Sequence, residues 1–333
     1  MKKIKVNRLK NKRKRKRRVF INAFINFFIK YFHYCKYLIN ILLALLYITL
    51  TKFKEKIKNP KVCICAVAKR ENLYIKEYVN YYKDLGYSHI FIYDNNDPDG
   101  ERFEDVIQDE INSNFVTIID YRGFRGPRQN PQMEAYYECY EKYNKDYDWL
   151  SFFDIDEFLE IKPHAKTIQQ FLTNKRYANC DTIKINFLFY SDNELLYYEN
   201  KPLQERFTTP LYKHGNNAFI KSTVRGGLKV NYWSQQCYVH TSAMKCNTCN
   251  SLGRKIAHNS LTNSPPSFEY ARLRHFYTKS TEEYLIKSSK GSVVADVRWD
   301  NARKKFKYNL YFVYNKRTKE KEDLLKKLFN MTL

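Results

Sequence analysis

Short apolar runs alternate with longer segments of helical periodicity along residues 59–160 of this 333-residue chain. The apolar runs are rich in β-branched residues, which is typical of strands that are buried on both faces of a sheet. We expect strands at 61–68, 88–93, 115–119 and 149–153, with helices at 71–85, 101–111 and 127–143 between them. Because strands and helices alternate, the pattern predicts an α/β domain with an open, Rossmann-like and mostly parallel central sheet.

The N-terminal part of the chain has a different pattern. Residues 1–18 form a polybasic arm without apolar periodicity, and residues 19–58 are mainly aromatic and aliphatic with scattered lysines. The purest apolar piece, residues 37–50, is shorter than the ~20 residues that a membrane-spanning helix needs. We expect a helix that lies in the membrane interface. A true span, with His33 and Lys36 reaching toward one surface, and an ordinary core helix are the alternatives.

The net charge of +24 is concentrated at the N-terminus. Residues 1–61 contain 19 Lys and Arg against the single Glu55, so they contribute +18, and the remaining residues 62–333 are only mildly basic, at 24 − 18 = +6. This distribution favours an anionic membrane surface over nucleic acid as the partner of the arm. No small-residue cleavage site indicates a removable signal peptide. Basic residues flank both ends of the apolar stretch, so the charge bias does not decide an orientation. We expect the stretch to lie in the cytoplasmic leaflet, held by acidic lipid, with the rest of the chain in the cytoplasm.

Four residues have a spacing compatible with zinc: Cys237, His240, Cys246 and Cys249 form the pattern C-x2-H-x5-C-x2-C. This spacing is not one of the common zinc motifs. Ordinary reduced cysteines are the first interpretation, with zinc or a disulfide as alternatives.

Polar side chains follow each of the four expected strands. Ligands bind beyond the carboxyl ends of the strands in open α/β sheets, so these loops predict one binding edge. No G-x-G-x-x-G or G-x-x-x-x-G-K-[ST] motif follows a strand, which disfavours a dinucleotide or P-loop site. The clusters are 69–71, 94–96, the Arg-rich loop 122–128, and Asp154-x-Asp156.

The stretch FFDIDEFLE, residues 152–160, places two carboxylates after a buried strand. Alternate residues of an extended chain share a face, so Asp154 and Asp156 can point the same way. Two adjacent carboxylates repel each other unless a cation or a shared proton intervenes. A hard divalent ion, Mn²⁺ or Mg²⁺, bridging these acids to a diphosphate resolves the conflict. A solvated acidic turn is the alternative.

Three blocks in order resemble family 2-like glycosyltransferases, in the branch near family 92. The first is CAVAKRENLYIKEYVNYYKDLGYSHIFIYDNND, the second is NPQMEAYYECYEKYNKDYDWLSFFDIDEFLE, and the third is LRHFYTKSTEEYLIKSSKG. Together they span about residues 61–291, and the first 60 residues lie outside the resemblance.

The resemblance implies a GT-A fold, a nucleotide-sugar donor that is most often UDP-linked, a divalent metal on the D-x-D motif, and inversion at the anomeric carbon. It implies that Asp154, Asp156 and His275 hold the metal, a packed histidine being the alternative for His275. Asp156 also counts as catalytic, and Glu157 is the acid beside it. The positions implied for the donor are Ala66, Lys69, Glu71, Asp94, Arg128, Gln132, Lys279 and Lys290.

The catalytic base is a separate hypothesis, because an inverting reaction needs a group that takes the proton of the acceptor hydroxyl. Glu205 is the first candidate, with His240 and Asp192 as rivals and a structural Glu205–Arg206 pair as the alternative. We expect transfer of a sugar to a surface glycan or glycolipid. A nucleic-acid-binding protein and a nucleotide-sugar-binding pseudoenzyme are the competing functions.

Overall fold

The computed structural model describes residues 24, 27–28, 30–47, 49, 58–124, 131–161, 165–229, 246–258, 260–289 and 301–329. The chain forms two compact units, Met1–Lys58 and Asn59–Leu333.

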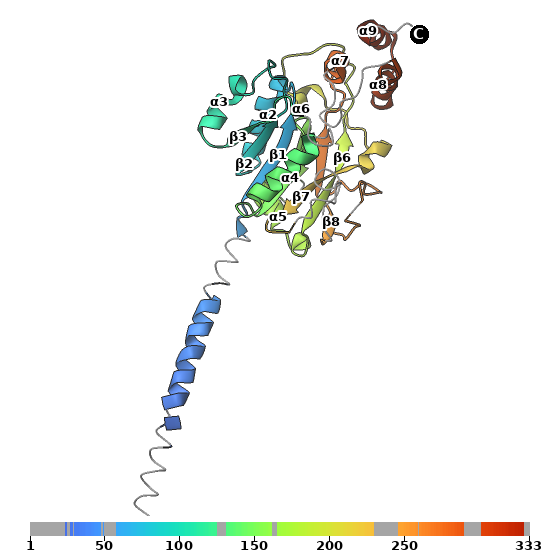
Figure 1. Ribbon diagram of the computed structural model, residues 1–333. Coiled ribbons are helices and arrows are strands. Elements are labelled where there is room, and N and C mark those ends of the chain that lie inside the picture. Colours follow the sequence, from blue (N-terminus) through green and yellow to red (C-terminus); the bar gives the residue numbers. More distant parts are fainter. Residues whose placement is uncertain are drawn as a thin grey trace, which may run out of the picture. The chain divides into compact units, whose positions relative to one another are not determined.

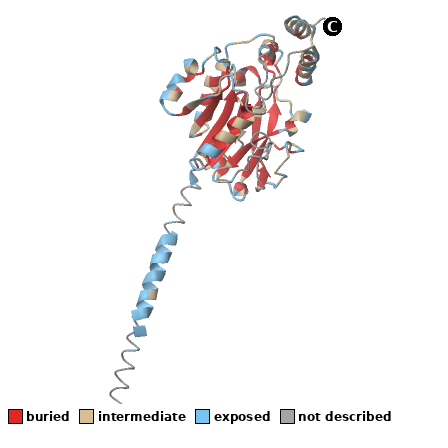
Figure 2. Ribbon diagram, viewed as in Figure 1, coloured by how far each residue is buried: buried red, intermediate tan, exposed pale blue. Residues whose placement is uncertain are grey.

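The N-terminal unit contains a helix over residues 30–47, and its large apolar side chains are exposed (Figure 2). Its polar residues Lys30, His33, Lys36 and Asn40 follow one another at intervals of three or four, so they share one face. Among the described helices, none combines the length and the apolar character that crossing a bilayer requires.

The first half of the catalytic unit confirms the expected alternation of strands and helices (Figure 1). Four parallel strands lie in the order β3-β2-β1-β4. The strands are β1 (Val62–Ala68), β2 (His89–Asp94), β3 (Val116–Asp120) and β4 (Trp149–Phe152). The helices are α2 (Asn72–Asp84), α3 (Glu104–Asn112) and α4 (Pro131–Tyr143).

The second half makes the sheet mixed rather than mostly parallel. β7 pairs antiparallel with β4, β6 antiparallel with β7, and β5 antiparallel with β9, while β9 and β8 pair parallel with β6. The strands are β5 (Glu157–Ile161), β6 (Thr182–Phe189), β7 (Ile220–Arg225), β8 (Thr248–Asn250) and β9 (Ala271–His275). Consequently, the ends of β1 to β4 and β9 and the starts of β5 and β7 meet at one edge.

Strand β1 is buried on both faces, as its continuous apolar run predicts (Figure 2). Val62, Ile64 and Ala66 belong to one apolar cluster, and Cys63 and Cys65 belong to a second cluster that α4 covers. The central strand therefore fixes the position of the binding edge through packing on both sides.

The C-terminal helices gather at one end of the unit (Figure 1). They are α7 (Thr281–Ser289), α8 (Asn301–Tyr314) and α9 (Lys319–Phe329), and the short helices α5 (Ile168–Leu172) and α6 (Leu203–Arg206) precede them. The buried carboxylate of Asp192 forms an ion pair with Lys321 Nζ, at 2.6 Å, and accepts a hydrogen bond from Tyr311 Oη, at 2.5 Å. Asp192, a rival candidate for the base, therefore anchors α8 and α9 to the sheet.

A disulfide joins Cys180 to Cys249. Cys249 is thus not available as a thiolate ligand in this structure, which corrects the four-residue zinc pattern. Cys246 Sγ lies 3.4 Å from the hydroxyl oxygens of Thr182 and Thr248, and Cys237 and His240 lie outside the described residues.

Candidate active site

The sheet topology brings two of the predicted metal ligands together. Asp156 follows β4, His275 ends β9, and Glu157 begins β5, directly opposite His275 in the β5–β9 ladder. His275 Nε2 lies 3.6 Å from Asp156 Oδ1 and 4.0 Å from Glu157 Oε1. Among the described residues, these three offer ligand atoms within 4.8 Å of one another, and all three are buried.

Packing fixes the imidazole of His275. Its ring centroid lies 4.6 Å from that of Phe187 and 4.8 Å from that of Phe189, both on β6. Burial lowers the pKa of His275 to about 3, so the ring is neutral near pH 7 and Nε2 can offer a lone pair to a cation. His275 is therefore both a packed histidine and a candidate ligand.

Asp154 lies beside Asp156 in the sequence but has other partners. Its Oδ1 accepts hydrogen bonds from Gln132 Nε2, at 2.8 Å, and from Tyr136 Oη, at 2.9 Å. Its Oδ2 lies 2.9 Å from the buried Nζ of Lys221, which is also 3.5 Å from Glu157 Oε1. The structure thus pairs Asp154 with a protein cation and leaves it outside the three-residue cluster.

Two lysines face the other oxygen of Asp156. Lys287 on α7 donates a hydrogen bond to Oδ2, and Lys279 Nζ lies 3.8 Å from the same atom. Burial by itself would raise the pKa of Asp156, but Lys287, Lys279 and His275 together lower this pKa below its usual range. Asp156 is therefore ionised near neutral pH.

Glu157 behaves differently from Asp156. Its side chain is fully buried, and burial raises its pKa well above the usual value; Lys221 opposes this rise, while Asp154 and Asp156 add to it. The oxygen Oε1 of Glu157 and the atom Nδ1 of His275 are buried and have no hydrogen-bond partner in the described part of the chain. A carboxylate held in this way gains a partner when a cation binds.

The donor atoms of Asp156, Glu157 and His275 fit a divalent ion. Separations of 3.6 and 4.0 Å suit ligands that surround one ion at about 2.1 Å. Carboxylate oxygens and a neutral imidazole suit Mn²⁺ in particular. Glu157 Oε1 accepts no hydrogen bond in the described part of the chain, and this is the observation that favours a cation at this point.

The loops after β1 and β2 carry several of the positions predicted for the donor. Lys69 Nζ lies 2.8 Å from an oxygen of Asp97, and Asp94 is buried with its Oδ2 2.8 Å from Arg122 Nη2. Burial raises the pKa of Asp94, against the opposing effects of the Asn96 backbone N–H and Arg122. Ala66 lies inside β1 with a buried side chain, not in the following loop.

Lys279 comes close to the predicted residue Glu71. Its Nζ is 3.9 Å from Glu71 Oε2, and it lies 4.1 Å from the centroid of the Tyr74 ring. Lys279 has a φ of 54°, a left-handed conformation that is unfavourable for a residue with a Cβ and is often found at functional sites. Arg128 and Lys290 lie outside the described residues.

Glu205 is an exposed residue of α6. The structure does not pair it with Arg206, since the buried guanidinium of Arg206 donates to both oxygens of Glu283, at 2.7 and 3.0 Å. The proposed structural pair between Glu205 and Arg206 is therefore corrected to Arg206–Glu283, and the catalytic role of Glu205 stays a prediction.

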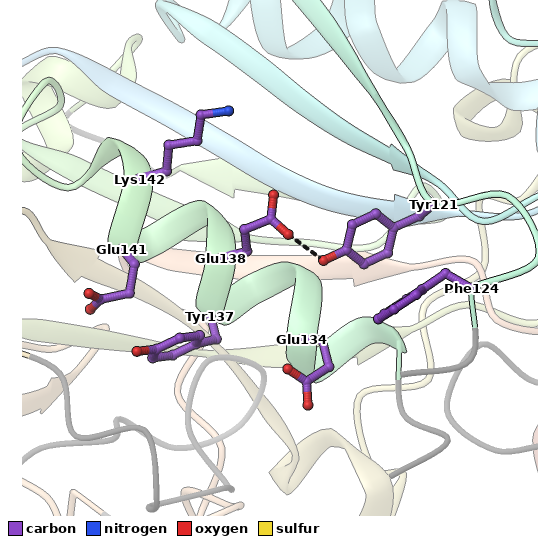
Figure 3. Close-up of a pocket in the computed structure, with 7 residues that line it drawn as sticks. All are labelled: Tyr121, Phe124, Glu134, Tyr137, Glu138, Glu141 and Lys142. Atoms are coloured by element: carbon purple, nitrogen blue, oxygen red, sulfur yellow. Dashed lines mark hydrogen bonds between the residues drawn. The ribbon is translucent and has the colours of Figure 1, made fainter. Parts of the chain in front are cut away.

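The opposite side of α4 carries a separate open pocket of about 660 Å³ (Figure 3). Gln132 and Tyr136 face Asp154, whereas Tyr137, Glu138 and Glu141 face this pocket. Tyr121 Oη donates a hydrogen bond to Glu138 across it, at 2.5 Å (Figure 3). None of the predicted metal or donor residues lines this pocket.

Sequence reasoning missed two cations, Lys221 and Lys287. Lys221 lies in β7, a short strand of mixed polarity that was itself not predicted, and nothing in its sequence marks this lysine as buried. Lys287 lies three positions before the predicted Lys290, within the third resembling block. Helix α7 turns Lys287 toward Asp156, and sequence alone did not distinguish between these two positions.

The chain is similar in sequence to proteins of one family. The model of the family "Glycosyltransferase family 92" matches residues 58–309. A family 92 protein of Oryza sativa subsp. japonica is 27% identical over 117 residues, which are 35% of this chain and 19% of that protein. One of Arabidopsis thaliana is 30% identical over 115 residues, 33% of this chain and 19% of that protein.

The aligned segment thus spans about a fifth of the length of these curated relatives. Among solved structures, S. aureus TarS has a TM-score of 0.35 at 10% identity, covering 81% of this chain and 43% of that one. The structure of S. aureus TarS 1–349 in complex with UDP also has a TM-score of 0.35, at 9% identity, covering 75% and 70%. From the match of its family model, the chain belongs to glycosyltransferase family 92.

Proposed function

We propose that this protein is a metal-dependent, inverting glycosyltransferase of the GT-A type that uses a nucleoside-diphosphate sugar, most often UDP-linked in this family. The observation that carries the proposal is the cluster of Asp156, Glu157 and His275. It lies at the edge where the loops after β1, β2 and β4 meet, inside the region that matches the family model. This edge is where open α/β sheets bind ligands.

The cluster would hold a single Mn²⁺ or Mg²⁺ through Asp156 Oδ1, Glu157 Oε1 and His275 Nε2. When bound, such an ion neutralises the charge that develops on a departing diphosphate. Asp154 supports the site by a different route. Its contacts with Lys221, Gln132 and Tyr136 hold the turn between β4 and β5 in place.

The chain's own cations complement the donor's negative charge. Lys279 and Lys287 lie on the far side of Asp156 from His275 Nε2, because they face Oδ2 while the imidazole faces Oδ1. Ammonium groups next to a leaving diphosphate stabilise it as point charges. Lys69 lies in the loop after β1 and Asp94 ends β2, and this is where we place the nucleoside part of the donor.

The acceptor reaction needs a base on the face of the sugar opposite the diphosphate. We propose Glu205 as this base, because its exposed carboxylate on α6 is accessible to the hydroxyl group of an acceptor. The acceptor that we propose is a surface glycan or glycolipid. The basic arm and the exposed apolar helix over residues 30–47 support an acceptor located at an anionic membrane.

We propose a membrane-associated protein, and the disulfide bears on the compartment of its catalytic domain. Disulfides persist in oxidising compartments and are rare in the cytoplasm of mesophiles. The Cys180–Cys249 bond therefore weighs against the cytoplasmic placement that the charge pattern suggested.

The test is hydrolysis and transfer with a panel of nucleotide sugars, with Mn²⁺ present or removed by chelation. We expect turnover of one donor class that requires the metal and is lost in Asp156→Asn. Nucleotide binding without turnover in the whole panel would favour the pseudoenzyme. Salt-sensitive binding of DNA or RNA by the full chain, with no nucleotide-sugar binding, would favour the nucleic-acid-binding alternative.

A further inference from the structure

A buried acid of α7, Glu283, holds the residues around Lys279 in place. Its side chain is 1% exposed, and its two oxygens accept four hydrogen bonds. The donors are Arg206 Nη1 and Nη2, at 2.7 and 3.0 Å, Tyr74 Oη, at 2.7 Å, and the backbone N–H of Ser280, at 3.1 Å. Glu283 therefore joins α2, α6 and the start of α7.

The contact with Ser280 fixes the backbone next to Lys279. The N–H of Glu283 donates in return to Ser280 Oγ, at 3.3 Å, so these two residues form a capping box at the start of α7. Lys279 precedes this cap with a φ of 54°, a left-handed conformation that costs free energy for a residue with a Cβ. Such a conformation persists only where the surrounding structure fixes it, and the capping box fixes the residue that directly follows Lys279.

The contact with Tyr74 fixes the ammonium group of Lys279. Its Nζ lies 4.1 Å from the centroid of the Tyr74 ring, which is a cation-π distance. The ring is buried, and its hydroxyl donates to Glu283, so the ring keeps one orientation. From this position, Nζ lies 3.8 Å from Asp156 Oδ2 and 3.9 Å from Glu71 Oε2. Glu283 thus helps to set the ammonium group as well as the backbone of Lys279.

Arg206 stabilises an ionised carboxylate at this buried position. Burial alone would raise the pKa of Glu283, but the hydrogen bonds it accepts, those from Arg206 first, hold this pKa below its usual value. The guanidinium is itself buried and also donates to the backbone carbonyl of Lys201, at 2.9 Å. Because Glu283 is ionised, its hydrogen bonds with Tyr74 and Ser280 are stronger than those of a neutral acceptor.

We propose that Glu283 is a positioning residue of the donor site, which sets Lys279 so that its ammonium group meets the diphosphate beside Asp156. This inference rests on the proposed function and extends it to the pair behind the donor site, Arg206 and Glu283. A fixed ammonium group recognises the diphosphate rather than the uncharged nucleoside. A lysine side chain that is already ordered loses less conformational entropy on binding than a mobile one does.

The matched test shortens two neighbouring glutamates of α7. Glu283→Asp keeps a carboxylate for Arg206, but it is one methylene too short to keep all four hydrogen bonds. Glu282→Asp makes the same change in a carboxylate that instead accepts from the backbone N–H of Tyr198, at 2.8 Å. The ring of Tyr74 stays in both variants.

NMR spectra of the full chain labelled with ¹³C-lysine report the position of Lys279. The ring of Tyr74 should shift the εCH2 signal of Lys279 upfield, and Lys279→Arg identifies this signal by removing it. Glu283→Asp should move the signal toward those of exposed lysines, whereas Glu282→Asp should not. Tyr74→Phe, which loses one hydroxyl and keeps the ring, is a milder second variant and should move the signal in the same direction.

Calorimetry with UDP and with uridine measures the consequence for donor binding. We expect Glu283→Asp to weaken UDP binding about tenfold, the effect of one hydrogen bond to a charged group. Uridine, which has no diphosphate, should bind to this variant as it does to the wild type, and Glu282→Asp should change neither affinity. A merely structural role of Glu283 would weaken both ligands or neither.

Two results would overturn the inference. One is a Lys279 signal that does not move in Glu283→Asp or Tyr74→Phe, or that moves equally in Glu282→Asp. The other is turnover of a nucleotide sugar with a UDP affinity that Glu283→Asp leaves unchanged, and this result leaves the proposed function standing. A signal that moves in Glu283→Asp, in a protein that binds no UDP, supports the positioning of Lys279 by Glu283 and removes the proposed function.

Discussion

Lys221 Nζ lies 2.9 Å from Asp154 Oδ2, and the lysine side chain is almost completely buried. Different cations therefore offset the negative charge of the two carboxylates of the D-x-D motif. Asp154 is neutralised by a lysine of β7, whereas Asp156 lies between His275 and the lysines of the C-terminal part. Asp154 therefore supports the structure of the site, and Asp156 is the candidate metal ligand.

The first prediction concerns this ion pair. Lys221→Met should lower the free energy of unfolding by about 1–3 kcal/mol, because it removes the cation that the half-buried carboxylate of Asp154 contacts. The double variant Lys221→Met/Asp154→Asn should regain a large part of this loss. Urea unfolding measures both variants. A double variant no more stable than Lys221→Met would show that the two residues are not coupled.

The second prediction concerns which residues hold the metal. Asp156→Asn and His275→Phe should each weaken Mn²⁺ binding at least tenfold, because each removes a donor atom from the cluster. Asp154→Asn should reduce stability but keep Mn²⁺ affinity within a few-fold of the wild type. Electron paramagnetic resonance of free Mn²⁺ gives the affinities without any assay of activity. A loss of Mn²⁺ binding in Asp154→Asn as large as in Asp156→Asn would restore Asp154 as a ligand.

The third prediction follows from the raised pKa of Glu157. A carboxyl whose pKa is higher in the folded than in the unfolded protein binds more protons when folded, so stability falls as pH rises above the unfolded value of about 4.3. Glu157→Gln keeps an acceptor for the Asp154 N–H, now 3.0 Å from Oε2, and cannot ionise. In the metal-free protein it should raise Tm by a few degrees at pH 8.

The comparison across pH provides the control for Glu157→Gln. The difference in Tm between variant and wild type should shrink as pH falls toward the unfolded pKa of about 4.3, because Glu157 is protonated in the folded state and becomes increasingly protonated in the unfolded state. The same variant should bind Mn²⁺ more weakly at pH 8. A Tm difference that stays constant from pH 8 to pH 5 contradicts the raised pKa.

The sequence predicted the first half of the catalytic unit well because its signals are local. The apolar run of β1 and the helical period of α2 depend on nearby residues, and the D-x-D after β4 follows from the same strand. The convergence of Asp156 and His275 came from the family resemblance, and the β5–β9 ladder supplies its physical basis.

The sequence named Glu157 only as the acid beside Asp156 and did not identify Lys221, because long-range pairing decides the positions of both. Glu157 faces the metal cluster because β5 reverses direction after the D-x-D and pairs with a strand more than 100 residues later. Lys221 reaches Asp154 because β7 pairs antiparallel with β4. Neither pairing leaves a signal in the sequence near those residues, so Lys221 could not be told from a surface lysine.

The fourth prediction concerns the N-terminal unit. The apolar side chains of residues 30–47 are exposed, and the lysines and His33 share one face, a pattern that suits a helix lying in a membrane interface. Protein that starts at Asn59 should lose flotation with vesicles containing anionic lipid, whereas the full chain should float. Leu42→Glu should weaken flotation more than Lys36→Gln does. Full flotation of the shortened protein would contradict a membrane role for this unit.

The fifth prediction concerns the disulfide between Cys180 and Cys249, which are 69 residues apart in the sequence. Closing a loop of this length restricts the unfolded chain and should stabilise the folded protein by about 4 kcal/mol on the chain-entropy model. Reduction should therefore lower Tm. It should have no such effect on the double variant Cys180→Ser/Cys249→Ser, whose Tm should match that of the reduced wild type. Mass spectrometry after alkylation without reductant checks the pairing, since labelling of both thiols in the native protein excludes the bond. Such labelling would show that Cys249 is not disulfide-bonded, and it would remove the argument against a cytoplasmic catalytic domain.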